Sequence, residues 1–174
     1  MNIELIKASL VNVIKLQSIC ISAYSENFGD HWDENGLELY LESEFSREKL
    51  TTNLKDEFLE YYFINLNDDC IGFIQVNYQA NLPEQITPEA AELKKIYMLP
   101  NYKGGGTGTS VFKQFIKIVR SKEKKVLFLY VIDQNSAAIR FYEKTGFKYH
   151  SKTVLDVPFF KEELRGMNCM YMNL

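Results

Sequence analysis

The sequence has few of the residues that build metal centres or disulfide frameworks. Its three cysteines, Cys20, Cys70 and Cys169, are odd in number and lie far apart in apolar surroundings, so we expect buried thiols rather than disulfides. Only two histidines are present, His31 and His150, and no group of residues has the spacing of metal ligands. The sequence therefore predicts no metal cofactor.

Long apolar runs are also missing. No window approaches 18 apolar residues, and the first ten residues, MNIELIKASL, do not have the charged and apolar regions of a targeting segment. We therefore expect a cytoplasmic protein with no membrane partner. The net charge of −3 argues against a general nucleic-acid surface, so the sequence predicts no nucleic-acid partner either.

The chain does have the length and the apolar content for one full core. Its 174 residues, 46% of them hydrophobic, predict a single domain over 1–174 and are too few for two ordinary domains. Charge is uneven, because positions 26–60 hold eleven acidic and three basic residues while the rest of the chain is net positive. Such asymmetry suits a protein that binds a polyanion on one side and a cation on the other. A solvated helical face is the simpler interpretation.

Hydrophobic periodicity predicts strands alternating with helices. Strands are expected at 3–8, 60–66, 70–79, 92–99, 126–132, 147–155 and 167–174. Helices are expected at 10–25, 33–45, from Ser46 onward, 111–119 and 135–144, and 80–91 is expected to be a loop. This order predicts an α/β fold (α+β in some schemes), with a mixed, mostly antiparallel sheet of six or seven strands and helices on both faces.

A glycine-rich turn between a strand and a helix is the central feature of the sequence. Residues 92–109 read ELKKIYMLPNYKGGGTGT. The first N–H groups of a helix have no intrahelical partner and attract anions, and glycines let the backbone close on a phosphate. Alone, the turn could equally be a flexible loop. It fits neither a P-loop, because Gly108 is followed by Thr109 and Ser110, nor a dinucleotide fingerprint, because position 111 is Val111.

A second motif decides between these interpretations. Residues 135–147 read NSAAIRFYEKTGF, which resembles the Asn-x-x-Ala-x-x-Phe-Tyr-x-x-x-Gly-Phe segment of the GNAT superfamily of acetyl-coenzyme A-dependent N-acetyltransferases. Residues 103–108, KGGGTG, resemble that family's pyrophosphate loop of Gln or Arg, two residues, Gly, one residue, and Gly or Ala. The segments 40–45 (YLESEF) and 71–77 (IGFIQVN) look like the bacterial spermine/spermidine N-acetyltransferase subgroup.

The resemblance implies where acetyl-coenzyme A is held. The pyrophosphate would lie on the N–H groups of residues 104–109 and the pantetheine arm along the end of the 92–99 strand, with the N–H of Met98 or Leu99 stabilising the oxyanion. Lys103 replaces the usual Gln or Arg, so it offers charge to phosphate without arginine's planar fork. The implied cofactor-binding residues are Tyr97, Met98, Leu99, Lys103, Gly104, Gly105, Gly106, Thr107, Gly108, Thr109, Asn135 and Tyr142.

Two residues are the candidates for proton transfer. The resemblance makes Tyr142 the general acid, because a phenol with a pKa of about 10 is protonated at neutral pH and can protonate a thiolate. On composition alone it would be a packed helix aromatic. Glu92 has the position of the family's catalytic glutamate and is the candidate base, with an exposed strand-edge carboxylate as the alternative. Asn135 can cap a helix and contact the cofactor arm at once.

The sequence identifies the acetyl acceptor less precisely than the acetyl donor. The acidic residues Glu26, Asp30, Asp33 and Glu34 are candidates for binding a cationic substrate. They favour acetyl transfer to a primary amine, a polyamine or another small cationic amine, by direct attack in a ternary complex. Lys94 is expected on the same face of the strand as Glu92, where it would repel a polyamine.

Two alternatives stay open at this point. One is acetylation of a protein N-terminus or lysine, which requires a groove open to a chain. The other is a non-catalytic sensor or interaction module that binds acetyl-coenzyme A. The sequence also leaves the oligomeric state open, with a homodimer as one alternative.

Overall fold

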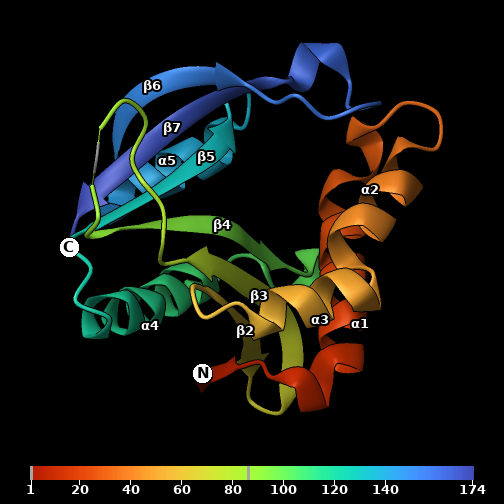
Figure 1. Ribbon diagram of the computed structural model, residues 1–174, viewed down its shortest axis with the longest axis horizontal. Helices are drawn as coiled ribbons and strands as arrows, with labels where there is room; N and C mark the ends of the chain where they lie inside the picture. The colour runs from red at the N-terminus through yellow and green to blue at the C-terminus, as the bar shows by residue number, and fades with distance from the viewer. Residues whose placement is uncertain (1, 86) are drawn as a thin grey trace.

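A seven-stranded sheet in the order β1-β2-β3-β4-β5-β7-β6 forms the centre of the molecule (Figure 1). The computed structural model describes residues 2–85 and 87–174; Met1 lies outside them, as does Ile86 in the loop expected at 80–91. Among the described strands only β4 and β5 pair in parallel. The strands are β1 (Ile3–Lys7), β2 (Leu59–Leu66), β3 (Asp69–Asn77), β4 (Ala90–Met98), β5 (Val126–Ile132), β6 (Lys148–Val154) and β7 (Gly166–Asn173). The expected mixed, mostly antiparallel sheet is confirmed.

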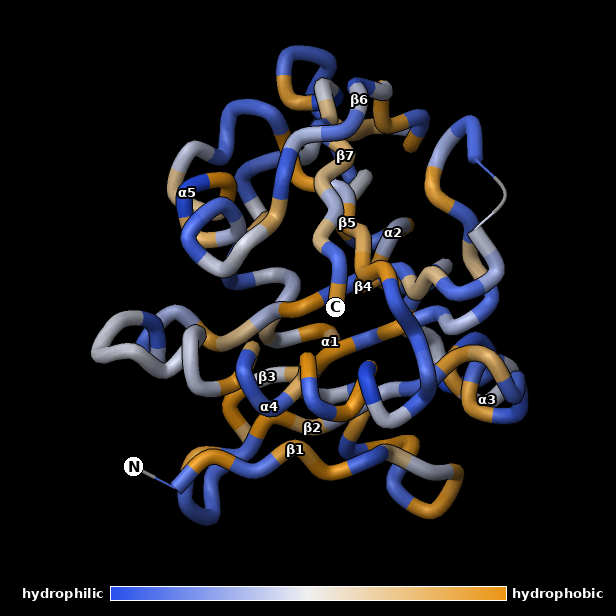
Figure 2. The backbone as a smooth tube through the Cα atoms, turned by 90° about the vertical axis from the view of Figure 1, so that its left-hand side faces the viewer, coloured by the Kyte–Doolittle hydropathy of each residue, from blue (hydrophilic) through white to orange (hydrophobic). Residues whose placement is uncertain are grey.

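Helices cover both faces of this sheet, as expected from the sequence. They are α1 (Val13–Phe28), α2 (Gly36–Phe45), α3 (Arg47–Lys55), α4 (Thr107–Ser121) and α5 (Ser136–Thr145). Apolar side chains of α4 and α5 pack into one core with β2–β5, and those of α1, α2 and α3 pack into a second core. In Figure 2, α5 changes between orange and blue along its length, as expected of a helix with one buried side.

The β4 strand contains an extra residue relative to β3. Gln75 pairs with Lys95 and Val76 pairs with Leu93, so Lys94 has no partner of its own and forms a β-bulge. A bulge interrupts the alternation of side chains between the two faces. It allows Lys94 and Lys95, which follow one another in the chain, to line the same cavity.

β4 and β5 run side by side for only four residue pairs. Pairing extends from Ala90 with Val126 to Leu93 with Leu129, and the register does not continue to residues 94–98. Figure 1 shows the two strands diverging beyond this point. The sheet therefore splits between β4 and β5. Beyond Leu93 and Leu129, the edges of these two strands that face each other are not paired.

Several element boundaries differ from those expected, and two of the differences have a cause in the hydrogen bonds or strand pairing. The helix expected at 33–45 begins at Gly36, because the Asp33 N–H donates to the Phe159 carbonyl and the Gly36 N–H to the Asp33 carbonyl. β4 begins at Ala90, inside the expected loop, because Ala90 and Ala91 pair with β5. Within the described residues no helix is both long and apolar enough to cross a bilayer.

Candidate active site

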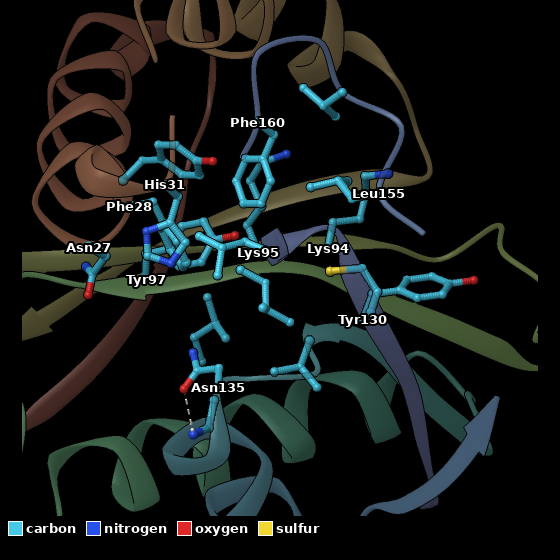
Figure 3. Close-up of a pocket in the computed structure, with 18 of the residues that line it drawn as sticks. Asn27, Phe28, His31, Lys94, Lys95, Tyr97, Tyr130, Asn135, Leu155 and Phe160 are labelled. Carbon is cyan, nitrogen blue, oxygen red and sulfur yellow. Dashed lines mark hydrogen bonds between the residues drawn. The ribbon is translucent and has the colours of Figure 1, made fainter. Parts of the chain in front are cut away.

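A cavity of about 890 Å³ opens where β4 and β5 separate. Its walls come from the end of α1 and the residues after it, from β4 and β5, from the start of α5, and from the connection between β6 and β7. Figure 3 shows Asn135 on one side of β4 and Phe160 on the other. The cavity is therefore reached from both faces of the sheet, and two reactants can meet beside β4.

The glycine turn forms the start of α4 with an unusual backbone. Gly104, Gly105 and Gly106 have φ angles of 95°, 57° and 83°, and Gly106 is the N-cap residue of α4. A Cβ atom at Gly104 or Gly106 would meet nothing within 4 Å, so these positions require glycine for its backbone conformation and not for space. Left-handed residues that precede a helix N-terminus turn N–H groups toward an anion.

Lys103 is connected to the end of β4 through Asn27 of α1. Its Nζ donates a hydrogen bond to Asn27 Oδ1, and Asn27 Nδ2 donates to the Met98 carbonyl at 2.9 Å and to the Ala23 carbonyl at 2.7 Å. All three of Asn27, Met98 and Lys103 line the cavity. One side chain therefore links the lysine before the glycine turn, the open edge of β4 and α1.

Of the two expected oxyanion donors, Met98 is the one whose N–H faces the cavity. The Leu99 N–H donates to the Ile71 carbonyl at 2.8 Å, toward β3. Backbone groups alternate in direction along a strand, so the N–H and carbonyl of Met98 face away from β3, where β4 has left β5. This edge and the glycine turn fit an extended donor arm ending in a pyrophosphate.

Asn135 and Tyr142 lie at the two ends of one wall, on α5. Asn135 Oδ1 accepts a hydrogen bond from the Ala138 N–H at 3.1 Å, so the expected N-cap is confirmed (Figure 3). Tyr142 packs between Phe112 and Phe147, and burial raises the pKa of its phenol to about 12. The hydroxyl is therefore protonated at neutral pH, as a general acid must be.

Glu92 and Lys94 share the cavity, as expected from their spacing. Lys94 Nζ lies 3.8 Å from Glu92 Oε2, and the Glu92 side chain is 18% exposed while that of Lys94 is 36% exposed. Glu92 is thus a partly buried carboxylate with access to the cavity rather than a free strand-edge charge. It can take a proton from an amine, directly or through water.

The four acidic residues expected to bind the substrate do not lie in this cavity. Asp30, Asp33 and Glu34 are exposed and do not line it, and Glu26 lines a separate surface hollow beside α1. Their segment turns its aromatic side chains inward and its carboxylates outward. The residues of the same segment that line the cavity instead are Asn27, Phe28, His31 and Trp32.

The sequence did not indicate Lys95 as a cavity residue. Lys95 is 7% exposed, and its Nζ donates to Glu44 Oε2 of α2 at 2.8 Å and to Gln75 Oε1 at 3.1 Å. Burial lowers the pKa of Lys95, and Glu44 opposes that effect. The only signal was a lysine in a strand with buried neighbours, which implies a buried acid without identifying it.

Aromatic side chains form the other part that sequence patterns did not reveal. Ring centroids lie 4.7 Å apart between Tyr24 and Tyr40, 4.8 Å between Trp32 and Tyr40, and 5.0 Å between Trp32 and Phe160. These four residues are called the aromatic wall below, and all of them line the cavity. No cluster of three or more His, Cys, Asp or Glu side chains suited to a metal ion occurs among the residues that the structure describes.

Comparison with known proteins identifies the family. A model described as the acetyltransferase (GNAT) family matches residues 19–147. The chain belongs to the GNAT family of acetyltransferases. The family, the enzyme class and the acetyl-coenzyme A cosubstrate expected from the sequence are confirmed.

Individual GNAT relatives differ in the acceptors that their names give. The spermidine N(1)-acetyltransferase of Thermoplasma acidophilum is 28% identical over 152 residues, which cover 85% of this chain and 89% of that protein. The crystal structure of the PaiA N-acetyltransferase of Thermoplasma acidophilum in complex with coenzyme A has a TM-score of 0.74 at 24% identity, with all of both chains covered.

A second structural neighbour has a protein acceptor in its name. The ribosomal-protein-S18-alanine N-acetyltransferase of Escherichia coli has a TM-score of 0.67 at 16% identity, with 99% of this chain and 94% of that chain covered. Structural likeness at such identities supports the GNAT fold alone. The acceptor of this GNAT enzyme must be argued from its own cavity.

Proposed function

We propose that this enzyme transfers the acetyl group of acetyl-coenzyme A to the primary amine of a small molecule, by direct attack in a ternary complex. The observation that carries the proposal is the separation of β4 from β5 after Leu93. Lys103, which immediately precedes the glycine turn, lines one cavity together with Glu92 and Tyr142. Access from both faces of the sheet lets donor and acceptor be held at the same time (Figure 3).

The donor site combines backbone groups with one lysine. The N–H groups at the start of α4 would hold the pyrophosphate, with Lys103 adding positive charge while its hydrogen bond to Asn27 orients it. The open edge of β4 at Met98 would hydrogen-bond the arm, and Asn135 would contact it from α5. The Thr107 N–H already donates to the Gly104 carbonyl at 3.1 Å, so the turn's remaining N–H groups make the phosphate contacts.

Three residues would carry the chemistry. The donor supplies a thioester whose carbonyl carbon accepts the amine. Glu92 takes the proton that the amine nitrogen loses as the new C–N bond forms. The Met98 N–H stabilises the negative charge on the carbonyl oxygen. Tyr142 gives its proton to the sulfur as the C–S bond breaks, and it regains one from solvent in the next cycle.

A polyamine acceptor is a second, finer candidate. The name of the Thermoplasma acidophilum relative supports it. The cavity supports it less, because Glu92 and Asp156 are the only acidic residues among its described lining and Lys94 and Lys95 accompany them. A protein terminus or lysine as acceptor, and a sensor without catalysis, are the remaining alternatives.

The proposal is tested by steady-state assays of free thiol release with acetyl-coenzyme A and a panel of amines. At least one small primary amine is expected to raise thiol release well above the background hydrolysis, with equimolar acetylated product detected by mass spectrometry. A protein that binds coenzyme A in calorimetry but acetylates no amine would be a sensor, and the proposal would be wrong.

A further inference from the structure

The acceptor side of the cavity is mostly apolar. Phe160 of the aromatic wall lies on the opposite side of β4 from Asn135, which belongs to the donor side (Figure 3), and the rings of Tyr24, Trp32 and Tyr40 form one contact network with Phe160. Burial raises the pKa values of Tyr24 and Tyr40, so both hydroxyls stay neutral. Burial also lowers the pKa of His31, whose imidazole is therefore uncharged at pH 7. This side presents rings and neutral polar groups to an acceptor.

The charged groups on the acceptor side disfavour an acceptor that carries a second positive charge. Lys94 lies 3.8 Å from Glu92, so the carboxylate that takes the amine proton already has a cation beside it. Lys95 is paired with Glu44 through a hydrogen bond, and its Nζ lies 5.7 Å from the centre of the Phe45 ring. Phe45 in turn packs against Tyr24 and Tyr40, so the aromatic wall has an ammonium group directly behind it.

From these contacts we infer that the preferred acceptor is a primary amine with an apolar or aromatic body and no second positive charge. The inference rests on the proposed function and specifies its substrate class. Aromatic faces attract cations, but the Lys95 ammonium already lies near the Phe45 ring, which packs against the aromatic wall, and Lys95 also engages Glu44. Asp156, the remaining carboxylate of the lining, is exposed at the rim of the cavity. A distal ammonium would lose its hydration without gaining a free partner.

Lys94 is the residue that we expect to set this selectivity. It is the bulge residue of β4, it lines the cavity beside Glu92, and its side chain is 36% exposed. Its charge therefore acts on a distal ammonium through space that water partly screens, and we expect a preference for the monoamine of about tenfold.

The test compares two acceptors that differ only in the second ammonium, pentylamine and 1,5-diaminopentane. For the unaltered enzyme, kcat/KM for pentylamine is expected to be about tenfold higher, although the diamine offers two reactive nitrogens. Phenethylamine is expected to be at least as good as pentylamine, and spermidine is expected to be as poor as the diamine. Raising the salt concentration should narrow the ratio, because exposed charges are screened.

Two variants assign the effect to Lys94. Lys94→Gln should reduce the monoamine preference about threefold or more, and Lys94→Glu should remove or invert it. Lys117→Glu makes the same change of net charge on the exposed side of α4, outside the cavity, and should leave the ratio unchanged. Circular dichroism and calorimetry with coenzyme A verify that each variant is folded and binds the donor.

The outcomes separate this inference from the proposed function. If the unaltered enzyme prefers the diamine or spermidine, the inference is overturned while amine acetylation stands. A monoamine preference that is the same in Lys94→Glu and Lys117→Glu would overturn the role of Lys94. Failure of every amine in the panel would overturn the proposed function itself.

Discussion

Asn27 Nδ2 lies 2.9 Å from the carbonyl oxygen of Met98, and the same side chain accepts a hydrogen bond from Lys103. A residue of α1 therefore holds both the open edge of β4 and the lysine of the glycine turn. Because a hydrogen bond contributes about 1 kcal/mol net, Asn27→Ala should raise the KM for acetyl-coenzyme A about five- to tenfold. The kcat value should change less.

This prediction has a matched control. Asn101→Ala removes an exposed amide from the neighbouring turn, outside the cavity, and should leave the KM unchanged. Calorimetric titration with coenzyme A gives the binding constant independently of turnover. Equal binding by Asn27→Ala and the unaltered enzyme would contradict the role assigned to Asn27.

Tyr142→Phe should lower kcat about 100-fold, because it removes the proton that the departing sulfur needs. The phenyl ring keeps the contacts with Phe112 and Phe147, so coenzyme A binding and thermal stability should change little. Tyr149→Phe, on the exposed part of β6, is the matched control and should have normal turnover. Undiminished kcat in Tyr142→Phe would assign the proton to another donor.

The pH dependence of kcat follows from the pKa of Tyr142. A general acid must be protonated, so its contribution is present below its pKa and is lost as the pH rises through it. Burial raises the pKa of Tyr142 to about 12, which moves this loss above the range in which the reaction is measured. The kcat profile should therefore show no falling limb from Tyr142 between pH 7 and about 10.5. A falling limb near pH 9 that is abolished in Tyr142→Phe would contradict the raised pKa of Tyr142.

Glu92→Gln should lower kcat/KM about 100-fold at pH 7 and less at higher pH. An alkylamine has a pKa of about 10, so the neutral nucleophile becomes abundant as the pH approaches that value and the base matters less. Initial rates at several pH values, with the amine well below its KM and acetyl-coenzyme A saturating, measure the effect. A loss of activity that is independent of pH would indicate a role in binding instead of proton transfer.

The ion pair of Glu44 with Lys95 should contribute measurably to stability. Glu44→Gln leaves the buried Lys95 ammonium without its partner, and we expect a loss of about 2 kcal/mol in the free energy of unfolding. This is less than for a fully buried pair because the Glu44 side chain is 32% exposed. The double variant Glu44→Gln with Lys95→Met should recover part of the loss in urea unfolding. Additive losses would show that the two residues are not coupled.

The ion pair of Glu44 with Lys95 should also make the protein less stable at acidic pH. Burial alone would raise the pKa of Glu44, but Lys95 outweighs it and the pKa is lowered. A carboxyl group with a lowered pKa contributes stability above its unfolded value of about 4.5 and loses it as the pH falls through the folded value. Unfolding free energies of the unaltered protein and Glu44→Gln should therefore begin to converge as the pH falls below about 4.5.

Local patterns were enough to predict the parts of the site that one segment builds. Asn135 caps α5 and Gly146 ends it with a φ of 106°, both within a stretch of a dozen residues. The glycine turn likewise carries its own backbone conformation. Because these features depend on neighbours in the sequence, they can be predicted without the tertiary structure.

Contacts between residues that lie far apart in the sequence could not be predicted in this way. Lys95 meets Glu44 across 51 positions, and Asn27 meets Met98 across 71. The aromatic wall exists only because Trp32 is brought beside Phe160, where the two residues form an isolated β-bridge. The acidic segment was recognised from composition, but composition does not determine which side of a turn faces inward.

The early end of β4–β5 pairing has a consequence beyond ligand binding. Exposed strand edges commonly pair with other chains and cause aggregation. In this protein the two free edges lie inside the sheet, between β4 and β5, with helices over both faces. A narrow extended molecule can reach them, but a strand of another sheet cannot. An open β-edge at this place is therefore less accessible to another chain than the outer edge strand of a sheet would be.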